Sequence, residues 1–186
     1  SKDPFALRRA AIGLLKILIE NNLEIKLRDL ISYAIRLFEE QDVKIENSNA
    51  EKEILDFLKE RMKNILKDKN IKYDIIEASI SSHVGDNYLD LFKKNILMNK
   101  YILKDVGKNA INSYKRAFNI IENMNGQIQG KPDAVLFRQE EERVLFEKIN
   151  EIRKAFTVKE DKKNYESLLL QMAETKTFTD NFFDKV

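Results

Sequence analysis

Cysteine is absent from the 186-residue sequence, and it contains only one histidine, two prolines and five glycines. Without cysteine the chain has no disulfide framework, no thiolate metal site and no cysteine nucleophile. So few glycines and prolines leave little room for a turn-rich β fold. These absences favour a helical protein, and a reducing, intracellular compartment is the expected setting.

Long apolar segments and catalytic motifs are also missing. The longest apolar stretch, residues 12–19, is interrupted by Gly13 and Lys16 and is far shorter than the ~18–20 residues of a membrane span. There is no glycine-rich phosphate loop and no G-x-S-x-G nucleophile elbow. The single histidine, His83, has no zinc-ligand partner at a familiar spacing. We therefore expect no membrane span, no metal site and no catalytic residue in this chain.

Helical periodicity dominates what is present. Hydrophobic residues make up 43% of the chain and charged residues 34%, which suits a buried core beneath a densely charged surface. Apolar residues recur at helical spacing in segments 4–20, 26–41, 50–68, 72–84, 86–101, 104–123, 139–156, 161–172 and from 177 onward. The prediction is an all-α bundle of about eight to nine helices, with Asp86 capping the fifth.

One linker is evident in the sequence. Residues 123–133, NMNGQIQGKPD, bring together Gly126, Gly130 and Pro132, which disfavour a continuous helix. We predict a single domain over residues 1–186, in which residues 133–186 form a looser subregion after this linker.

Positive charge is concentrated in one segment, although the whole chain carries a net charge of only +2. Residues 93–116 hold one acid, Asp105, and seven basic residues: Lys93, Lys94, Lys100, Lys104, Lys108, Lys115 and Arg116. The basic excess is therefore local, and it coincides with the helix expected at 104–123.

Within that helix the polar residues share a face. Lys108, Asn112, Lys115 and Asn119 follow one another at helical spacing, and Arg116 flanks them. Lysine and arginine can contact phosphates while asparagine can pair with base edges, so the face suits RNA with an exposed loop. The alternative is an ordinary solvated helix face. The opposite face is expected to pack, and it consists of Ala110, Tyr114, Ala117, Phe118 and Ile121. This prediction places the two aromatic residues, Tyr114 and Phe118, in the core.

Two specific stretches stand near the ends of the chain, DPFALRRAAIGLLKIL at 3–18 and FTDNFFDKV at 178–186. The first resembles the start of the C-terminal anticodon-binding region of the bacterial glycyl-tRNA synthetase β subunit, and the second is similar to the closing FFDxV pattern of that region. Between them the likeness continues in order through LRDLISYAI at 27–35, ILDFLKERM at 54–62, KYDIIEASI at 72–80 and INSYKRAFNII at 111–121.

The resemblance implies a DALR-like helical bundle that binds glycine tRNA at its anticodon, within a cytoplasmic α2β2 glycine–tRNA ligase. The ATP- and magnesium-dependent chemistry would belong to the α subunit, so this chain would be non-catalytic and need no cofactor. Its partners would be the tRNA, the α subunit and the rest of the β subunit, with neither DNA nor membrane. The expected RNA-binding residues are Arg8, Arg9, Lys108, Asn112, Lys115, Arg116 and Asn119. The alternative is a helical interaction module of the β subunit that does not touch RNA.

Two interpretations remain open for Arg8 and Arg9, which lie near a helix N-terminus where the macrodipole disfavours cations. Either arginine could pair with Asp180 or Asp184 and tie the ends of the bundle together. Alternatively, they could hold tRNA phosphate, since Arg9 shares one helix face with Gly13 and Lys16.

Overall fold

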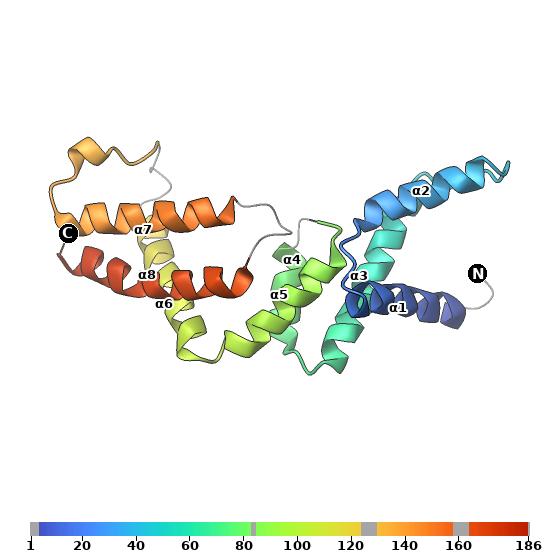
Figure 1. Cartoon of the computed structure of the whole chain (residues 1–186), viewed down its shortest axis with the longest axis horizontal. Helices are drawn as coiled ribbons and strands as arrows, with labels where there is room; N and C mark the ends of the chain where they lie inside the picture. The colour runs from blue at the N-terminus through green and yellow to red at the C-terminus, as the bar shows by residue number, and fades with distance from the viewer. Residues whose placement is uncertain (1–3, 83–84, 124–129, 158–163, 186) are drawn as a thin grey trace. The chain divides into compact units, whose positions relative to one another are not determined.

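The computed structural model describes residues 4–82, 85–123, 130–157 and 164–185, and these contain eight α-helices, one short 3-10 helix and no strand. This confirms the all-α prediction, whereas the DALR-like type stays a prediction. In chain order the elements are α1 (Pro4–Glu20), α2 (Leu27–Glu39), α3 (Ala50–Asp68), α4 (Tyr73–Ser82), α5 (Tyr88–Tyr101), α6 (Asp105–Asn123), η1 (Ala134–Leu136), α7 (Glu140–Phe156) and α8 (Tyr165–Lys185) (Figure 1). His83 and most of the predicted linker lie outside the described residues.

Two details of the helix prediction are wrong. One continuous helix, α8, runs from Tyr165 to Lys185, where two separate segments were expected at 161–172 and from 177 onward. The cap of α5 is Asn87, whose side-chain oxygen accepts the backbone N–H of Asp90 at 3.1 Å. Asp86 instead bonds the first turn of α2, where its carboxylate accepts a hydrogen bond from the backbone N–H of Arg28 at 2.9 Å.

The helices divide into two compact units, Ser1–Asn99 and Lys100–Val186. The prediction that residues 1–186 form a single domain stays a prediction. In the first unit α3 packs against α1, α2 and α4. The fully buried side chains include one or more from each of these helices: Leu15, Leu27, Met62, Leu66 and Ile76.

Polar contacts join α5 to this unit. The hydroxyl of Tyr88 donates to the backbone carbonyl of Leu55 on α3 at 3.0 Å. The buried amide of Asn95 accepts from the Ser79 hydroxyl on α4 at 2.8 Å and donates to the Leu91 carbonyl at 2.9 Å. Buried polar groups are costly unless they are bonded, so these contacts specify how α5 sits on α3 and α4.

In the second unit α8 is the central helix and packs against both α6 and α7. One ion pair joins the end of α8 to the start of α7 (Lys185–Glu141, 2.6 Å). A second joins the middle of α7 to the middle of α8 (Lys148–Glu174, 3.1 Å). The two helices are therefore antiparallel (Figure 1). Of the helices in the described part of the chain, none is both long and apolar enough to cross a membrane.

Candidate nucleic-acid interface

Small side chains form the surface by which α6 meets α8. The buried residues of α6 are Gly107, Ala110 and Ser113, at three-residue intervals along the helix. Such a row allows two helix backbones to approach closely. Gly107 also lies against the turn before α6, because a Cβ atom there would come within 2.4 Å of the Tyr101 carbonyl oxygen. This face orients α6 and decides which of its side chains point outward.

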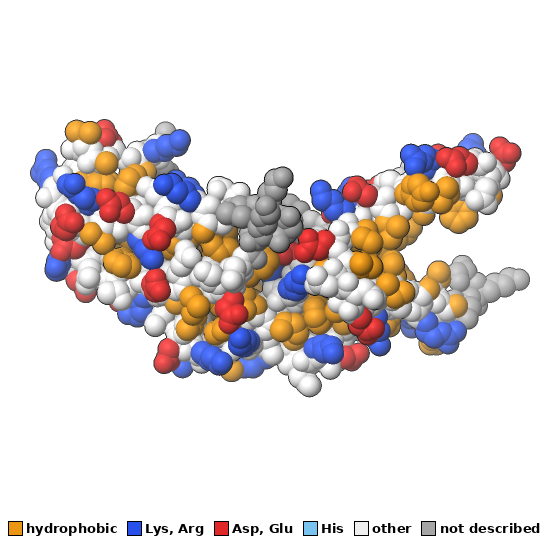
Figure 2. All heavy atoms as spheres, viewed as in Figure 1, with side chains coloured by type: hydrophobic (Ala, Val, Ile, Leu, Met, Phe, Trp, Pro, Cys, Tyr) orange, Lys and Arg blue, Asp and Glu red, His pale blue; other side chains and the backbone are white. Residues whose placement is uncertain are grey.

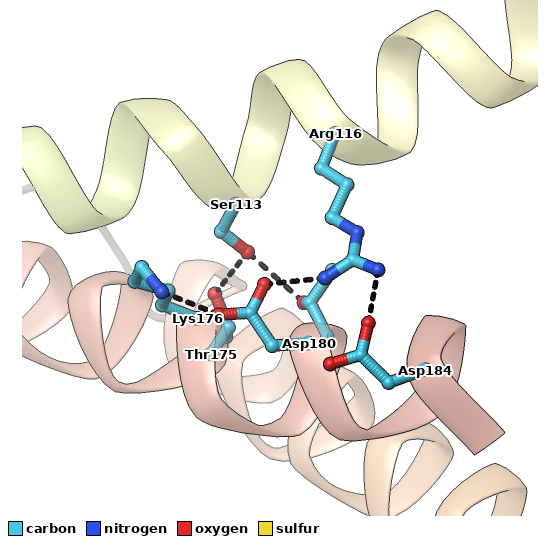
Figure 3. A network of polar contacts seen from close by, with 7 residues as sticks. Ser113, Arg116, Thr175, Lys176, Asp180 and Asp184 are labelled. Carbon is cyan, nitrogen blue, oxygen red and sulfur yellow. Dashed lines mark hydrogen bonds and ion pairs between the residues drawn. The ribbon is translucent and has the colours of Figure 1, made fainter.

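A buried cluster of hydroxyl groups fixes the rotation of α6 on α8. The Ser113 hydroxyl lies 3.0 Å from both the Thr175 and the Thr179 hydroxyls (Figure 3). Thr175 also donates to the backbone carbonyl of Met172 at 2.6 Å. Because three buried hydroxyl groups satisfy one another, rotating α6 would leave polar groups unpaired, at a cost of about 1–3 kcal/mol each.

Arg116 extends from α6 to two carboxylates one turn apart on α8. Its guanidinium donates to Asp180 at 2.8 Å and to Asp184 at 2.6 Å (Figure 3). The guanidinium carbon lies 5.3 Å from the ring centre of Phe183. Lys176 also donates to Asp180. The hydrogen bonds that Asp180 accepts from Lys176 and Arg116 lower the pKa of its carboxyl. The hydrogen bonds that Arg116 donates to Asp184 and Asp180 raise the pKa of its guanidinium. The two acids considered as partners of Arg8 or Arg9 thus bond Arg116.

The four-residue polar row predicted on α6 lies on its outer surface. Lys108, Asn112, Lys115 and Asn119 are all exposed. Between Val106 and Ile121 the helix carries three basic side chains and no acid. Since Arg116 is bonded to two carboxylates, Lys108 and Lys115 supply the positive charge of this outer face.

The prediction that Tyr114 and Phe118 lie in the core is wrong. Their exposed fractions are 64% and 45%, and Ile121 is 50% exposed one turn further along. The two rings stack on each other, with centroids 5.7 Å apart and planes inclined by 25°. Sequence reasoning assigned the large apolar residues to the packing face, whereas α6 packs through its small residues. The row Gly107, Ala110 and Ser113 is the signal that could have revealed this.

Arg8 and Arg9 belong to the first unit, where both lie exposed on α1. The Arg8 guanidinium carbon is 5.4 Å from the centre of the Phe5 ring, a cation–π distance. Gly13, on the same helix, is surrounded by open space, because a Cβ atom there would have no neighbour within 4 Å. The phosphate-binding interpretation of the two arginines stays a prediction.

A second surface lies in the first unit, where α1, α2 and α3 enclose an open apolar groove of about 700 Å³. Figure 2 shows hydrophobic side chains gathered where these three helices face one another. Each helix contributes apolar lining residues that are more than a third exposed: Leu7 on α1, Leu30 and Phe38 on α2, and Ile54 on α3.

Among the described residues, no group of three or more histidine, cysteine, aspartate or glutamate side chains could hold a metal ion. The described surfaces present hydrogen-bond donors and aromatic rings on α6, and apolar side chains in the groove.

Comparison with known proteins gives a consistent result along the chain. The family model described as glycyl-tRNA synthetase beta subunit matches residues 1–81. The glycine–tRNA ligase beta subunit of Rickettsia africae (strain ESF-5) is 37% identical over 186 residues, which are 100% of this chain and 26% of that protein. The corresponding subunit of Glaesserella parasuis serovar 5 is 32% identical over the same share of both chains.

The chain thus spans about a quarter of the length of the curated relatives that it matches. Similarity extends over every residue of it, including both compact units. Over its full length the chain is similar to beta subunits of glycine–tRNA ligase, and its residues 1–81 match the family described as glycyl-tRNA synthetase beta subunit.

Proposed function

We propose that this chain is a tRNA-binding part of a glycine–tRNA ligase, and that the outer face of α6 contacts glycine tRNA in its anticodon region. In this proposal the chain serves glycyl-tRNA synthesis without performing its chemistry. ATP-dependent aminoacylation belongs to the α subunit of the enzyme, which would be a partner of this chain together with the rest of the β subunit.

The observation that carries the proposal is the polar row on α6. Two lysines and two asparagines project from one exposed helix face, and no acid interrupts them between Val106 and Ile121. Ammonium groups bind phosphates and amide groups read base edges, which is the donor set used for RNA. An uninterrupted row also avoids the repulsion that a carboxylate would exert on the phosphate backbone.

Arg116 receives a positioning role in this proposal. Its two ion pairs hold α6 to α8, so its charge is compensated within the protein and it orients the neighbouring Lys115. Only two lysines then meet phosphates. The slope of log K against log[salt] should be about −1.4 to −1.8, because each phosphate contact contributes about 0.7–0.9.

The test is a salt titration of binding to glycine tRNA, with Lys115→Gln as the variant and Lys154→Gln on α7 as the control. Both lysines are exposed residues of the second unit. Lys115→Gln should reduce the slope of log K against log[salt] by about 0.7–0.9, the contribution of one phosphate contact. Lys154→Gln should leave the slope unchanged. Equal effects of the two substitutions would show that the α6 face is not the contact surface.

Anticodon reading is tested with the same tRNA carrying an exchanged anticodon. If the asparagines read bases, the native anticodon should bind more tightly at every salt concentration. Asn119→Ala should remove that difference while leaving the salt slope intact. Equal binding of both tRNAs by the unaltered chain would contradict base reading and leave only a phosphate-binding surface.

A second candidate function, protein interaction, is favoured by the apolar groove of the first unit. The groove of about 700 Å³ is large enough to receive apolar side chains from one face of a helix. We propose that it binds another part of the β subunit, since the chain accounts for only 26% of its relatives' length. This function uses a different unit from the RNA contact, and the two are compatible.

The groove is tested by Leu30→Ser and Ile54→Ser, which alter exposed lining residues. Each substitution should weaken association of the chain with the remainder of the β subunit, measured by calorimetry, without changing affinity for tRNA. The polar exchange Lys52→Gln on α3 is the control. Unchanged association would exclude the groove as the docking site.

A further inference from the structure

Helix α6 buries its small side chains and exposes its large ones. Gly107, Ala110 and Ser113 are buried, while Tyr114 and Phe118 are 64% and 45% exposed. Exposing aromatic rings forgoes the stabilisation that their burial would supply. Because α6 already packs through the small residues and their hydroxyl bonds, the two rings contribute little to this interface.

The exposed rings are arranged as a pair. Tyr114 and Phe118 are one helical turn apart, and their nearly parallel rings stack with centroids 5.7 Å apart. The polar row runs beside them, because Lys115 and Asn119 are their immediate neighbours in sequence. The aromatic pair and the polar row thus lie on adjoining faces of one helix, since successive residues are about 100° apart around the helix axis.

We propose that Tyr114 and Phe118 form a stacking platform for unpaired bases of a single-stranded RNA segment. Resting on the proposed function, this inference specifies the form of RNA that the α6 face takes: a loop with unstacked bases and not a duplex. Proteins bind single strands by stacking bases on aromatic side chains while cations follow the phosphates. Bases inside a duplex are already stacked on one another and cannot reach such a platform.

The surroundings of the pair favour RNA over a protein partner. A protein-docking surface is depleted of lysine at its centre, whereas Lys115 directly follows Tyr114 and Asn119 directly follows Phe118, so a cationic and an amide side chain flank the pair. The apolar surface suited to a protein segment is the groove of the first unit, where the lining is almost entirely hydrophobic. The chain therefore carries two surfaces of different chemistry.

The experiment compares the 186-residue chain with the double variant Tyr114→Leu/Phe118→Leu. The probes are a single-stranded RNA with the sequence of the glycine tRNA anticodon loop and a blunt RNA duplex of the same length. Leucine keeps an apolar side chain and good helix propensity, and the melting temperature of each variant verifies folding. Tyr73→Leu is the matched control, because Tyr73 is also 64% exposed. Tyr114→Phe, which keeps the ring, is the conservative variant.

The double variant should lose about tenfold or more in affinity for the single strand and less than twofold for the duplex. Tyr114→Phe and Tyr73→Leu should both bind like the unaltered chain. A 2-aminopurine base in the single strand supplies a second readout. Stacking should quench the fluorescence of this base when the strand is bound to the unaltered chain. A saturating concentration of the double variant should leave the fluorescence unquenched.

Other outcomes separate the two proposals. If Lys115→Gln weakens RNA binding but the double variant does not, the stacking platform is overturned and the phosphate contact stands. If the unaltered chain binds neither probe nor glycine tRNA, both proposals fail. If the double variant keeps its RNA affinity and loses association with the α subunit, the aromatic pair is a protein contact, which overturns the inference.

Discussion

Tyr88 shows how its surroundings alter the chemistry of a single side chain. It is 4% exposed and donates its hydroxyl proton to the Leu55 carbonyl. Burial, together with the negative charges of Asp56 and Asp86, raises its pKa to about 12. A buried phenol is stable only in its neutral form, so the attachment of α5 to α3 depends on pH.

We predict that the first unit loses stability as pH rises above about 10, the pKa of tyrosine in an unfolded chain. The folded state holds the Tyr88 proton up to about pH 12, so between these values unfolding releases a proton and is favoured by alkali. Tyr88→Phe should cost about 0.5–1.5 kcal/mol at neutral pH, because it removes one hydrogen bond.

Denaturant unfolding at pH 8 and pH 11 measures this effect. The free energy of unfolding should fall more in the unaltered chain than in Tyr88→Phe, so that the two converge in alkali. Tyr73→Phe, at an exposed tyrosine, is the control. An equal fall in both variants would contradict the assignment to Tyr88.

Asp180 leads to a prediction of how stability changes at low pH. Lys176 and Arg116 lower its pKa in the folded state, so the stability it contributes is present above the unfolded value of about 3.9. That contribution is lost as pH falls through the lowered folded pKa. Asp180→Asn should therefore reduce the melting temperature at pH 7, and the difference from the unaltered chain should shrink at pH 3. A difference of the same size at both pH values would contradict an ionic role for Asp180.

At the scale of the helix, two glycines make opposite predictions. Gly107→Ala places a methyl group 2.4 Å from the Tyr101 carbonyl oxygen and 2.7 Å from the Ile102 Cα. Overpacking of this kind costs about 1–3 kcal/mol, because backbone atoms must move. Gly13→Ala on α1 meets nothing within 4 Å, and it should stabilise the chain by about 0.5–1 kcal/mol, since alanine loses less entropy in a helix.

Thermal or denaturant unfolding of both variants measures the pair. Gly107→Ala should also weaken RNA binding, because it displaces the start of the helix that carries Lys108. Gly13→Ala should leave RNA binding unchanged. A neutral Gly107→Ala substitution would show that α6 does not depend on close packing against the preceding turn.

The sequence predicted the helices well where apolar residues face a core. The bounds of α1 and α3 agree with the periodicity to the residue, because Leu15, Met62 and Leu66 follow it. Prediction failed where packing depends on small or hydroxyl side chains. Thr175 and Thr179 are buried and lie within hydrogen-bond distance of Ser113, and the sequence of a polar residue does not reveal such a partner. The prediction therefore divided α8 into two helices and assigned the wrong face of α6 to packing.

The candidate site was predicted in the same uneven way. Exposure of Lys108, Asn112, Lys115 and Asn119 follows from their spacing, since polar residues sharing one helix face turn outward together. The carboxylate partners of Arg116 lie 64 and 68 residues away, and spacing along the chain cannot reveal a pairing over that separation. The exposed aromatic pair was missed because large apolar residues are normally buried.

Considered as a whole, the chain offers different binding chemistry in each of its two units. The first unit exposes an apolar groove, and the second exposes lysines, asparagines and two aromatic rings on α6. In a chain that spans a quarter of the length of the relatives it matches, the proposed functions would place binding to the rest of the β subunit in one unit and binding to tRNA in the other. Substitutions in one unit should then leave the other function intact.

The most direct measurement is photo-crosslinking of the chain to glycine tRNA from a benzophenone side chain placed at Tyr114, with Tyr73 as the matched position. The two tyrosines have the same exposed fraction, 64%, and lie in different units. The account predicts cross-links from position 114 to nucleotides of the anticodon loop and none from position 73. Equal cross-linking from both positions, or none from position 114 in a saturated complex, would contradict the claim that α6 contacts the tRNA.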